Sequence, residues 1–207
     1  MEIVLATKNR KKIEEIKKIC DTIGTDFKIY TLDDFPQYQD IEEDGDTFEA
    51  NAVKKAVYIS KRTGMTALAD DSGLEVDALN GAPGVFSARY AGESADDRAN
   101  LEKLLREMKN IPPEKRRARF VCCIAMASGD EVRTFHGYVE GVIGTEPRGE
   151  NGFGYDPVFY PEGHDRTFAE MSDSEKNALS HRGAALRELQ KYLLEKTDTS
   201  GDIGDNS

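Results

Sequence analysis

The sequence predicts an α/β protein with a mixed β-sheet flanked by helices, and three observations support this fold class. Apolar runs of strand length alternate with segments whose apolar residues recur at helical spacing. Two β-rich runs, 119–127 and 132–143, follow one another closely and predict an antiparallel hairpin that widens the sheet. A chain of 207 residues is long enough for one globular domain, or two closely apposed lobes, with a substantial core.

The first expected unit is a strand followed by a helix. Residues 3–6 form an apolar run, and isoleucines then recur at helical spacing up to about residue 23. The turn between the two elements is polar and basic, with the residues Thr7, Lys8, Asn9, Arg10, Lys11 and Lys12. A helix N-terminus beside four cationic side chains favours an anion such as a phosphate group. The alternative is a simple N-cap by Thr or Asn with a solvated basic turn.

The second unit contains an acidic loop. A strand is expected over 28–32, and the loop that follows it carries Glu42 and Glu43. Most charges of such a loop are expected to be solvated. A helix that begins near Thr47 and ends at Gly64 contains Lys55, which can supply a cation to the same region.

Two adjacent carboxylates follow the next apolar run. Residues 65–69 predict a buried strand, and Asp70, Asp71, Ser72 and Gly73 come directly after it. Ligands of open α/β sheets collect beyond the carboxyl ends of strands. Paired carboxylates at such a position hold a hard cation or transfer protons, and the sequence does not rank Asp70 above Asp71. A polar turn with an Asp cap is the alternative.

Aromatic and polar residues meet again after the expected hairpin. A glycine-rich loop over 149–161 contains Phe153, Gly154, Tyr155 and Asp156. This run suits a flat heteroaromatic ligand, through stacking and a directed hydrogen bond. It equally suits an Ω-loop that is packed by its own aromatic side chains.

The last expected elements are helical. A helix is predicted over 96–108, before the hairpin, and a capping box over 172–175 begins the C-terminal helical region. Lys176, His181 and Arg182 form a compact cluster of hydrogen-bond donors there. Residues 1–196 are therefore expected to form the folded domain, and the polar segment 197–207 a disordered tail.

Composition limits the classes of function. The formal net charge of −11 argues against broad nucleic-acid binding, which needs a basic face. The three cysteines are odd in number and lack zinc-ligand spacing, so burial as free thiols in a reducing compartment is expected. No apolar run is long enough to span a bilayer, and the N-terminus does not resemble a signal peptide. A cytoplasmic protein is the resulting prediction.

Five blocks of residues resemble the inosine/xanthosine triphosphate pyrophosphatase (Ham1-like) family. They are Thr7-x-Asn9-x-x-Lys12, Asp46-Thr47-Phe48-Glu49-Ala50-Asn51-Ala52 with Lys55, Ala69-Asp70-Asp71-Ser72-Gly73-Leu74, Phe153-Gly154-Tyr155-Asp156-Pro157 and Ser180-His181-Arg182. Their order along nearly the whole chain is far more specific than any single block. Lys8 stands where a glycine is common in the family, which should affect only the detail of the phosphate loop.

The resemblance implies an elongated mixed sheet, two lobes around a central cleft, and a homodimer. It also implies Mg²⁺-dependent hydrolysis of the non-standard purine nucleotides ITP, dITP and XTP to the monophosphate and pyrophosphate. Asp71 is then expected to be catalytic and, together with Glu42 or Glu43, to bind the magnesium ion. The nucleotide-binding residues implied are Thr7, Lys8, Asn9, Arg10, Lys11, Lys12, Lys55, Ser72, Phe153, Gly154, Tyr155, Asp156, Lys176, His181 and Arg182.

Two other functions remain compatible with the sequence. A Maf-like pyrophosphatase of similar architecture would act on other nucleotides, although the aromatic loop and the Ser-His-Arg block favour purines. A non-catalytic nucleotide-binding or metal-sensing module would keep the basic turn, but it has no need for paired carboxylates beside an acidic loop.

Overall fold

The computed structural model of the chain describes residues 1–38 and 41–200. Within this part a six-stranded sheet has the order β2-β1-β3-β4-β5-β6. Its strands are β1 (Glu2–Leu5), β2 (Lys28–Thr31), β3 (Thr66–Val76), β4 (Arg117–Ser128), β5 (Glu131–Ile143) and β6 (Phe159–Pro161). Strand β1 pairs in parallel with β2 and β3, whereas β3 to β6 pair in antiparallel fashion. The predicted mixed sheet and its hairpin are confirmed.

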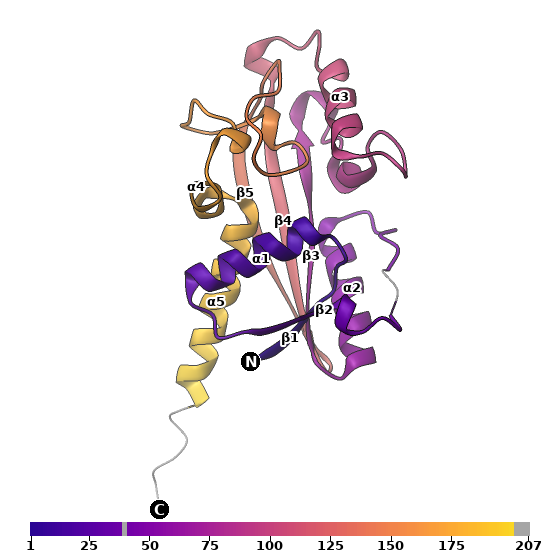
Figure 1. Cartoon of the computed structure of the whole chain (residues 1–207), viewed down its shortest axis with the longest axis vertical. Coiled ribbons are helices and arrows are strands. Elements are labelled where there is room, and N and C mark those ends of the chain that lie inside the picture. Colours follow the sequence, from indigo (N-terminus) through magenta and orange to yellow (C-terminus); the bar gives the residue numbers. More distant parts are fainter. Residues whose placement is uncertain (39–40, 201–207) are drawn as a thin grey trace, which may run out of the picture.

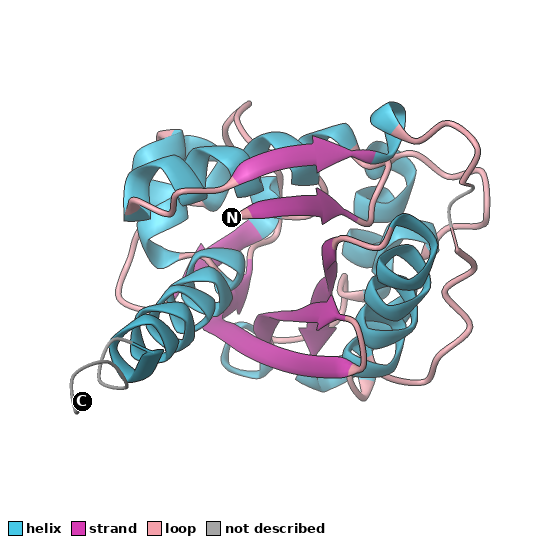
Figure 2. Cartoon of the chain, turned by 90° about the horizontal axis from the view of Figure 1, so that it is seen from below, coloured by secondary structure: helices cyan, strands magenta, loops and turns pink. Residues whose placement is uncertain are grey.

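Helices cover both faces of the curved, open sheet (Figure 2). The α-helices in the described residues are α1 (Arg10–Ile23), α2 (Phe48–Thr63), α3 (Asp97–Glu107), α4 (Asp173–Leu179) and α5 (His181–Ser200). The long strands β3, β4 and β5 run the length of the molecule, with α1, α2 and α5 around one half and α3 and α4 around the other (Figure 1). This arrangement is the expected pair of lobes on an elongated sheet. None of the helices in 1–38 and 41–200 has the length and hydropathy of a membrane span.

Local sequence signals set the ends of these helices. Asn9 caps α1 and Thr47 caps α2, each through its side chain, and Gly64 ends α2 with a positive φ of 70°. Ser172 and Glu175 form the expected capping box of α4. Helix α5 extends to Ser200, so it includes the first residues of the predicted tail, while 201–207 lie outside the described residues.

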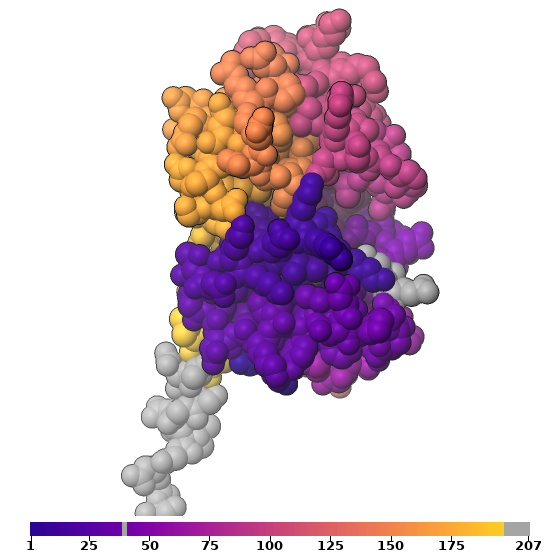
Figure 3. Space-filling model, in the orientation of Figure 1, coloured from indigo at the N-terminus to yellow at the C-terminus, as the bar shows by residue number. Residues whose placement is uncertain are grey.

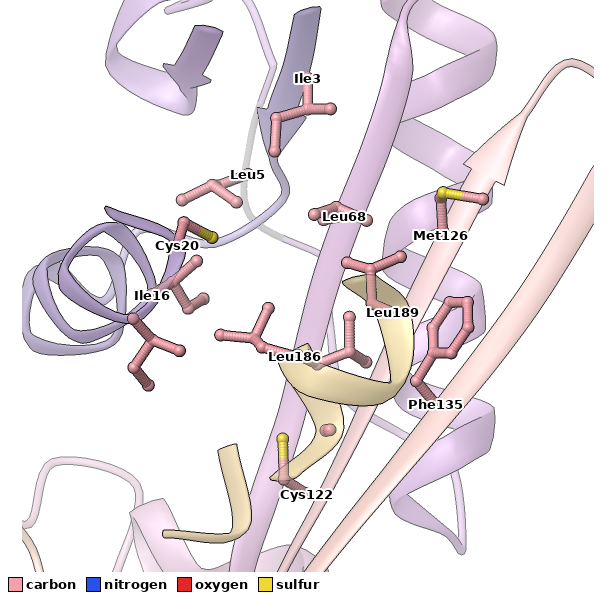
Figure 4. Close-up of a cluster of buried hydrophobic side chains, with 13 residues drawn as sticks. Ile3, Leu5, Ile16, Cys20, Leu68, Cys122, Met126, Phe135, Leu186 and Leu189 are labelled. Carbon is pink, nitrogen blue, oxygen red and sulfur yellow. The ribbon is translucent and has the colours of Figure 1, made fainter. Parts of the chain in front are cut away.

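The sheet separates two apolar clusters because alternate residues of a strand face opposite sides. On one face, Leu186 and Leu189 of α5 pack between α1 and the strands (Figure 4). Leu68 of β3 belongs to this cluster, whereas its neighbour Ala69 belongs to the cluster beneath α2 on the other face. By the same alternation, Asp70 faces the α1–α5 side and Asp71 faces the α2 side.

The predicted end of β3 at residue 69 is wrong. The strand continues to Val76 because β4 pairs with it from Ala67 to Val76. What does end is the pairing with β1, whose last partner on β3 is Leu68. Asp70 and Asp71 therefore lie in mid-strand, just beyond the carboxyl end of β1, where one edge of β3 has lost its neighbour.

Candidate active site

A cleft of about 180 Å³ opens at this free edge of β3. In the space-filling view the N-terminal part of the chain lies on one side of the boundary between the lobes, with the α3 region and the aromatic-loop region on the other (Figure 3). The cleft gathers thirteen of the residues proposed from sequence: Thr7, Asn9, Lys12, Glu43, Asp71, Ser72, Phe153, Gly154, Tyr155, Asp156, Lys176, His181 and Arg182. Segments from both ends of the chain thus contribute to one site.

Asp71 lies at the α2 side of the cleft beside one buried cation. The Nζ atom of Lys55 is 3.6 Å from Asp71 Oδ1 and 2.5 Å from Glu43 Oε1, and it donates to the Asp70 carbonyl at 2.9 Å. Burial raises the pKa of Asp71 to about 6, against the opposing effect of Lys55. Asp71 Oδ2 is buried and has no hydrogen-bond partner among the described residues. The group is thus a carboxylate with an unused ligand atom and a pKa suited to a general base.

The acidic loop contributes Glu43 rather than Glu42 to the cleft. Glu43 lines the cleft and shares Lys55 with Asp71. Glu42 is exposed and does not line the cleft, and its backbone carbonyl accepts a hydrogen bond from Lys54. The pair that can hold a divalent cation between carboxylates is therefore Asp71 and Glu43.

Asp70 has a different environment, although it is the next residue. Its carboxylate contacts Lys12 Nζ at 2.6 Å and Arg182 Nε at 2.8 Å, and it also accepts from Ser72. Burial alone raises the pKa of Asp70, but Arg182 and Lys12 hold it well below its usual range. Asp70 is therefore a fully paired anion that fixes two cations, and it does not line the cleft.

A second buried acid, Glu15 of α1, extends this network. It contacts Arg182 and lies 3.1 Å from Lys176 Nζ, which also donates to Asp156 Oδ2 at 2.7 Å. Helix α1, helix α4 and the aromatic loop are thereby joined through one chain of charges. Glu15 has no signal in the sequence, because a glutamate in an amphipathic helix is expected to be solvated.

The part of the cleft around Phe120 and Phe153 is aromatic. His181 stacks on Phe120 with ring centroids 4.9 Å apart, and Lys176 Nζ lies 4.8 Å from the centre of the Phe153 ring. Burial lowers the pKa of His181 well below its usual range, so the imidazole is neutral. Its Nδ1 atom is buried without a hydrogen-bond partner in the described residues. A neutral imidazole beside aromatic rings suits a planar, hydrogen-bonding ligand.

The predicted basic turn is only partly assembled. Asn9 Oδ1 accepts from the backbone N–H groups of Lys11 and Lys12, so the N-cap takes donors that an anion would otherwise use. Lys8 and Arg10 are exposed and do not line the cleft, and Lys11 pairs with Asp97 of α3 at 2.7 Å. Lys12 is the lysine of this turn that reaches the cleft.

Several lining residues were not proposed from the sequence. The most informative is Ser87, whose Oγ accepts from the Leu74 backbone N–H at 2.9 Å and whose carbonyl accepts from Tyr155 Oη at 2.8 Å. A Cβ atom on Gly73 would lie 2.4 Å from Ser87 Oγ, which explains the glycine after the acidic pair. The remaining ones are Val85, Ala88, Asp97, Asn100 and Phe120. No local pattern in the segments that hold these residues indicates a ligand, and the fold brings them to the cleft.

Comparison with known proteins places this architecture and site among described relatives. Residues 3–192 match the model of the Ham1 family. A dITP/XTP pyrophosphatase of Halalkalibacterium halodurans is 52% identical, covering 93% of this chain and 98% of that protein. The dITP/XTP pyrophosphatase of Bacillus subtilis is 49% identical, covering 93% of this chain and 96% of that protein.

Solved structures agree with the sequence relatives. A Ham1 protein from Coxiella burnetii superimposes with a TM-score of 0.85 at 46% identity, covering 94% of this chain and 99% of that one. The Staphylococcus aureus Ham1 protein gives a TM-score of 0.84 at 45% identity, covering 95% of this chain and 100% of that one. The matched residues span both lobes and the whole cleft, and the chain belongs to the Ham1 family.

Proposed function

We propose that this chain is a dITP/XTP pyrophosphatase that hydrolyses dITP, ITP and XTP to the nucleoside monophosphate and pyrophosphate. One observation carries the proposal: among the described residues of the cleft, Asp71 Oδ2 and His181 Nδ1 are both buried and lack partners. A carboxylate oxygen suits the phosphate end of a nucleotide and a ring nitrogen suits the edge of its base. The names of the relatives, about half identical over most of the chain, support the same substrate class.

A magnesium ion is expected between Asp71 and Glu43. Lys55 already holds a positive charge against both carboxylates, and Asp71 Oδ2 has unused ligand capacity. Mg²⁺ prefers a small number of carboxylates together with water and phosphate oxygens, and this donor set fits it. When bound, the ion supplies charge compensation to the phosphate oxygens.

The residues of the cleft can then divide the work of α–β bond cleavage. Water replaces pyrophosphate on the α-phosphorus, and the Asp71 carboxylate accepts the proton that the water loses. Lys12, which lines the cleft, and Lys55, which is buried beside Asp71, are the cations expected to offset negative charge on the leaving pyrophosphate. Little covalent chemistry is required of the protein, so the rate depends on positioning and charge compensation.

Purine selectivity is expected to come from the other end of the cleft. Arg182 uses four of its five N–H groups on Asp70, Glu15 and Ser72. One N–H of Arg182 and the ring of His181 remain for a ligand. Hypoxanthine and xanthine present a carbonyl oxygen at C6, which a donor here binds, whereas the amino group of adenine would face that donor. Phe153 lines the cleft beside Lys176 and Arg182, and its ring is expected to stack on the base.

The homodimer and the cytoplasmic location are part of the same proposal. Tyr138 and Val142 of β5 are large apolar residues with exposed side chains, as a self-association surface requires. All three cysteines are free and buried, which fits a reducing compartment. Light scattering on the purified chain measures the first property, and cell fractionation the second.

The decisive experiment is a panel of nucleoside triphosphates scored for pyrophosphate release, with and without Mg²⁺. ITP, dITP and XTP should release pyrophosphate only with Mg²⁺, and ATP, CTP and UTP should react far more slowly. Preferential turnover of pyrimidine nucleotides would favour the Maf-like alternative. Binding of ITP without any turnover would reject the enzymatic proposal.

A further inference from the structure

A glutamate, a cysteine and a histidine meet outside the cleft, on the α2 face of the sheet. Cys123 of β4 and His136 of β5 are direct cross-strand partners, and Glu49 comes from the first turn of α2. One ligand atom from each residue lies within 4.8 Å of the other two. His136 Nε2 already lies 3.0 Å from Glu49 Oε2. None of the three lines the cleft, so the proposed reaction does not account for this grouping.

One residue of the cluster is buried, and the other two are accessible to solvent. Cys123 is fully buried, whereas the His136 and Glu49 side chains are 36% and 55% exposed. His136 and Glu49 line a groove of about 740 Å³ between the start of α2 and strands β4 and β5. An ion can therefore reach the imidazole and the carboxylate through the groove. The Cys123 sulfur does not line the groove, but it lies within 4.8 Å of both of these ligand atoms.

Cys122, the residue before Cys123, allows the hydrogen bonding of two buried thiols in this sheet to be compared. Cys122 faces the other side, and its Sγ donates to Asp70 Oδ2 at 3.1 Å. Within residues 1–38 and 41–200, the thiol of Cys123 makes no hydrogen bond, although a carboxylate and an imidazole lie beside it. The Cys123 sulfur thus has unused ligand capacity at the point where two other ligand groups converge.

We propose that Glu49, Cys123 and His136 form a binding site for a thiophilic divalent cation, with Zn²⁺ as the best match. Zinc accepts one sulfur, one nitrogen and one oxygen ligand in a tetrahedron whose fourth position holds water. Bond lengths of roughly 2.0–2.3 Å require ligand atoms about 3.3–3.8 Å apart. The contact between His136 and Glu49, at 3.0 Å, must therefore open slightly, and the other separations in the group start from at most 4.8 Å.

Binding involves one proton and no change of oxidation state. The Cys123 S–H bond breaks, its proton passes to solvent, and the sulfur electron pair forms the bond to Zn²⁺. The donor set differs in kind from the carboxylates of the cleft, although Asp71 is the direct partner of Cys123 on β3. Sulfur and imidazole select zinc over magnesium, whereas carboxylate and water ligands suit magnesium. Excess Mg²⁺ should therefore leave this second site available.

Titration with Co²⁺ in excess Mg²⁺ tests the site on the full chain, because Co²⁺ reports its ligands by absorption. One equivalent should produce a thiolate-to-cobalt charge-transfer band with the strong visible bands of a tetrahedral ion, and Zn²⁺ should displace it. Cys123→Ser should abolish the charge-transfer band. His136→Asn and Glu49→Gln should each weaken Co²⁺ binding at least ~10-fold, as expected for loss of one of three protein ligands.

Matched variants distinguish this site from any other cysteine or histidine. Cys20→Ser removes a buried thiol of the α1 core, and His164→Asn removes an exposed imidazole, so both should leave the titration unchanged. Absence of a thiolate band in the wild-type chain overturns the proposal, as does a band that survives in Cys123→Ser. If Cys123→Ser fails to fold, the His136→Asn variant decides, because His136 is half-buried and unchanged Co²⁺ affinity in that variant also overturns the proposal.

Discussion

The two sides of β3 at Asp70 and Asp71 are built from similar charges but differ in how completely those charges are paired. On the α1–α5 side, Asp70 is held by Lys12 and Arg182, and no carboxylate oxygen of Asp70 is left without a partner. On the α2 side, Asp71 lies near Lys55 but keeps one buried oxygen unpaired, and its pKa is raised to about 6. The difference teaches that two adjacent carboxylates of one strand can have opposite environments, one fully paired and one with an unpaired oxygen.

The largest effect is expected from substitution of Asp70, and it should appear in the stability of the protein. Asp70→Asn removes the carboxylate that pairs with Lys12 and one of the two buried acids that pair with Arg182, so the free energy of unfolding should fall by about 3–5 kcal/mol. Urea denaturation measures this change. Asp173→Asn is the matched control, because it removes an exposed partner of Lys18 and should change stability little. Equal losses in the two variants would contradict the positioning role.

The second effect falls on turnover at Asp71. Asp71→Asn keeps the shape of the side chain but removes the proposed proton acceptor and the proposed metal ligand, so turnover of ITP should fall at least ~100-fold. The fold should remain intact by circular dichroism, since no ion pair of the Asp70 network is lost. Near-normal turnover of a folded Asp71→Asn protein would end the catalytic assignment and return Asp70 as the candidate.

The sequence predicts the acidic pair but not the contrast between its two members, because the strand end that it predicts is wrong. The sequence predicts the strand, the acidic pair and the glycine that follows, but it predicts that the strand stops at residue 69. Apolar periodicity is lost at Asp70, and polar residues inside a strand that borders a cleft give the same pattern as a turn. Once the strand continues to Val76, the period of two places the two carboxylates on opposite faces.

The residues that could not be predicted are those that depend on long-range contacts. Glu15 is indistinguishable in sequence from the solvated glutamate next to it, yet it is buried against Arg182, far along the chain. Lys8, Arg10 and Lys11 share the charge of Lys12, but the direction of the first helical turn sends only Lys12 into the cleft. Composition and spacing predict the type of residue that lines a site. Packing determines which of several similar residues along the chain reaches it.

The third effect concerns the preference for ITP over ATP, and it is expected at Arg182, a partner of Asp70. Arg182→Ala removes the donor expected at the base edge, so the ratio of ITP to ATP turnover should fall at least ~10-fold, as expected for a charged hydrogen bond. Arg182→Lys is the matched variant, since it keeps a cation beside Asp70 and Glu15 but loses the guanidinium fork. It should retain more stability than the alanine variant and still lose selectivity. An unchanged ITP-to-ATP ratio in both variants would remove Arg182 from base recognition.

The smallest effect, and the most specific, is the dependence of stability on pH in metal-free buffer. Burial raises the pKa of folded Asp71 to about 6, above the value near 4 of an unfolded aspartate, so the folded chain binds more protons between pH 4 and pH 6. Wild-type stability should therefore fall relative to Asp71→Asn as pH rises through this window, by at most ~1.4 kcal/mol per pH unit. For Asp70 the sign is opposite.

The ion pairs of Asp70 hold its folded pKa well below the unfolded value, so its stabilising contribution is complete above pH 4 and is lost as pH falls through the folded pKa. The loss of stability in Asp70→Asn relative to wild type should accordingly shrink in acid. The gain of stability in Asp71→Asn should shrink there as well, because residue 71 is then neutral in both folded proteins. Urea denaturation of the three proteins at a series of pH values gives both curves. Above pH 6, Asp70→Asn should be less stable than wild type and Asp71→Asn more stable. If both variants differ from wild type in the same direction, the two faces of β3 do not differ in the way their contacts indicate.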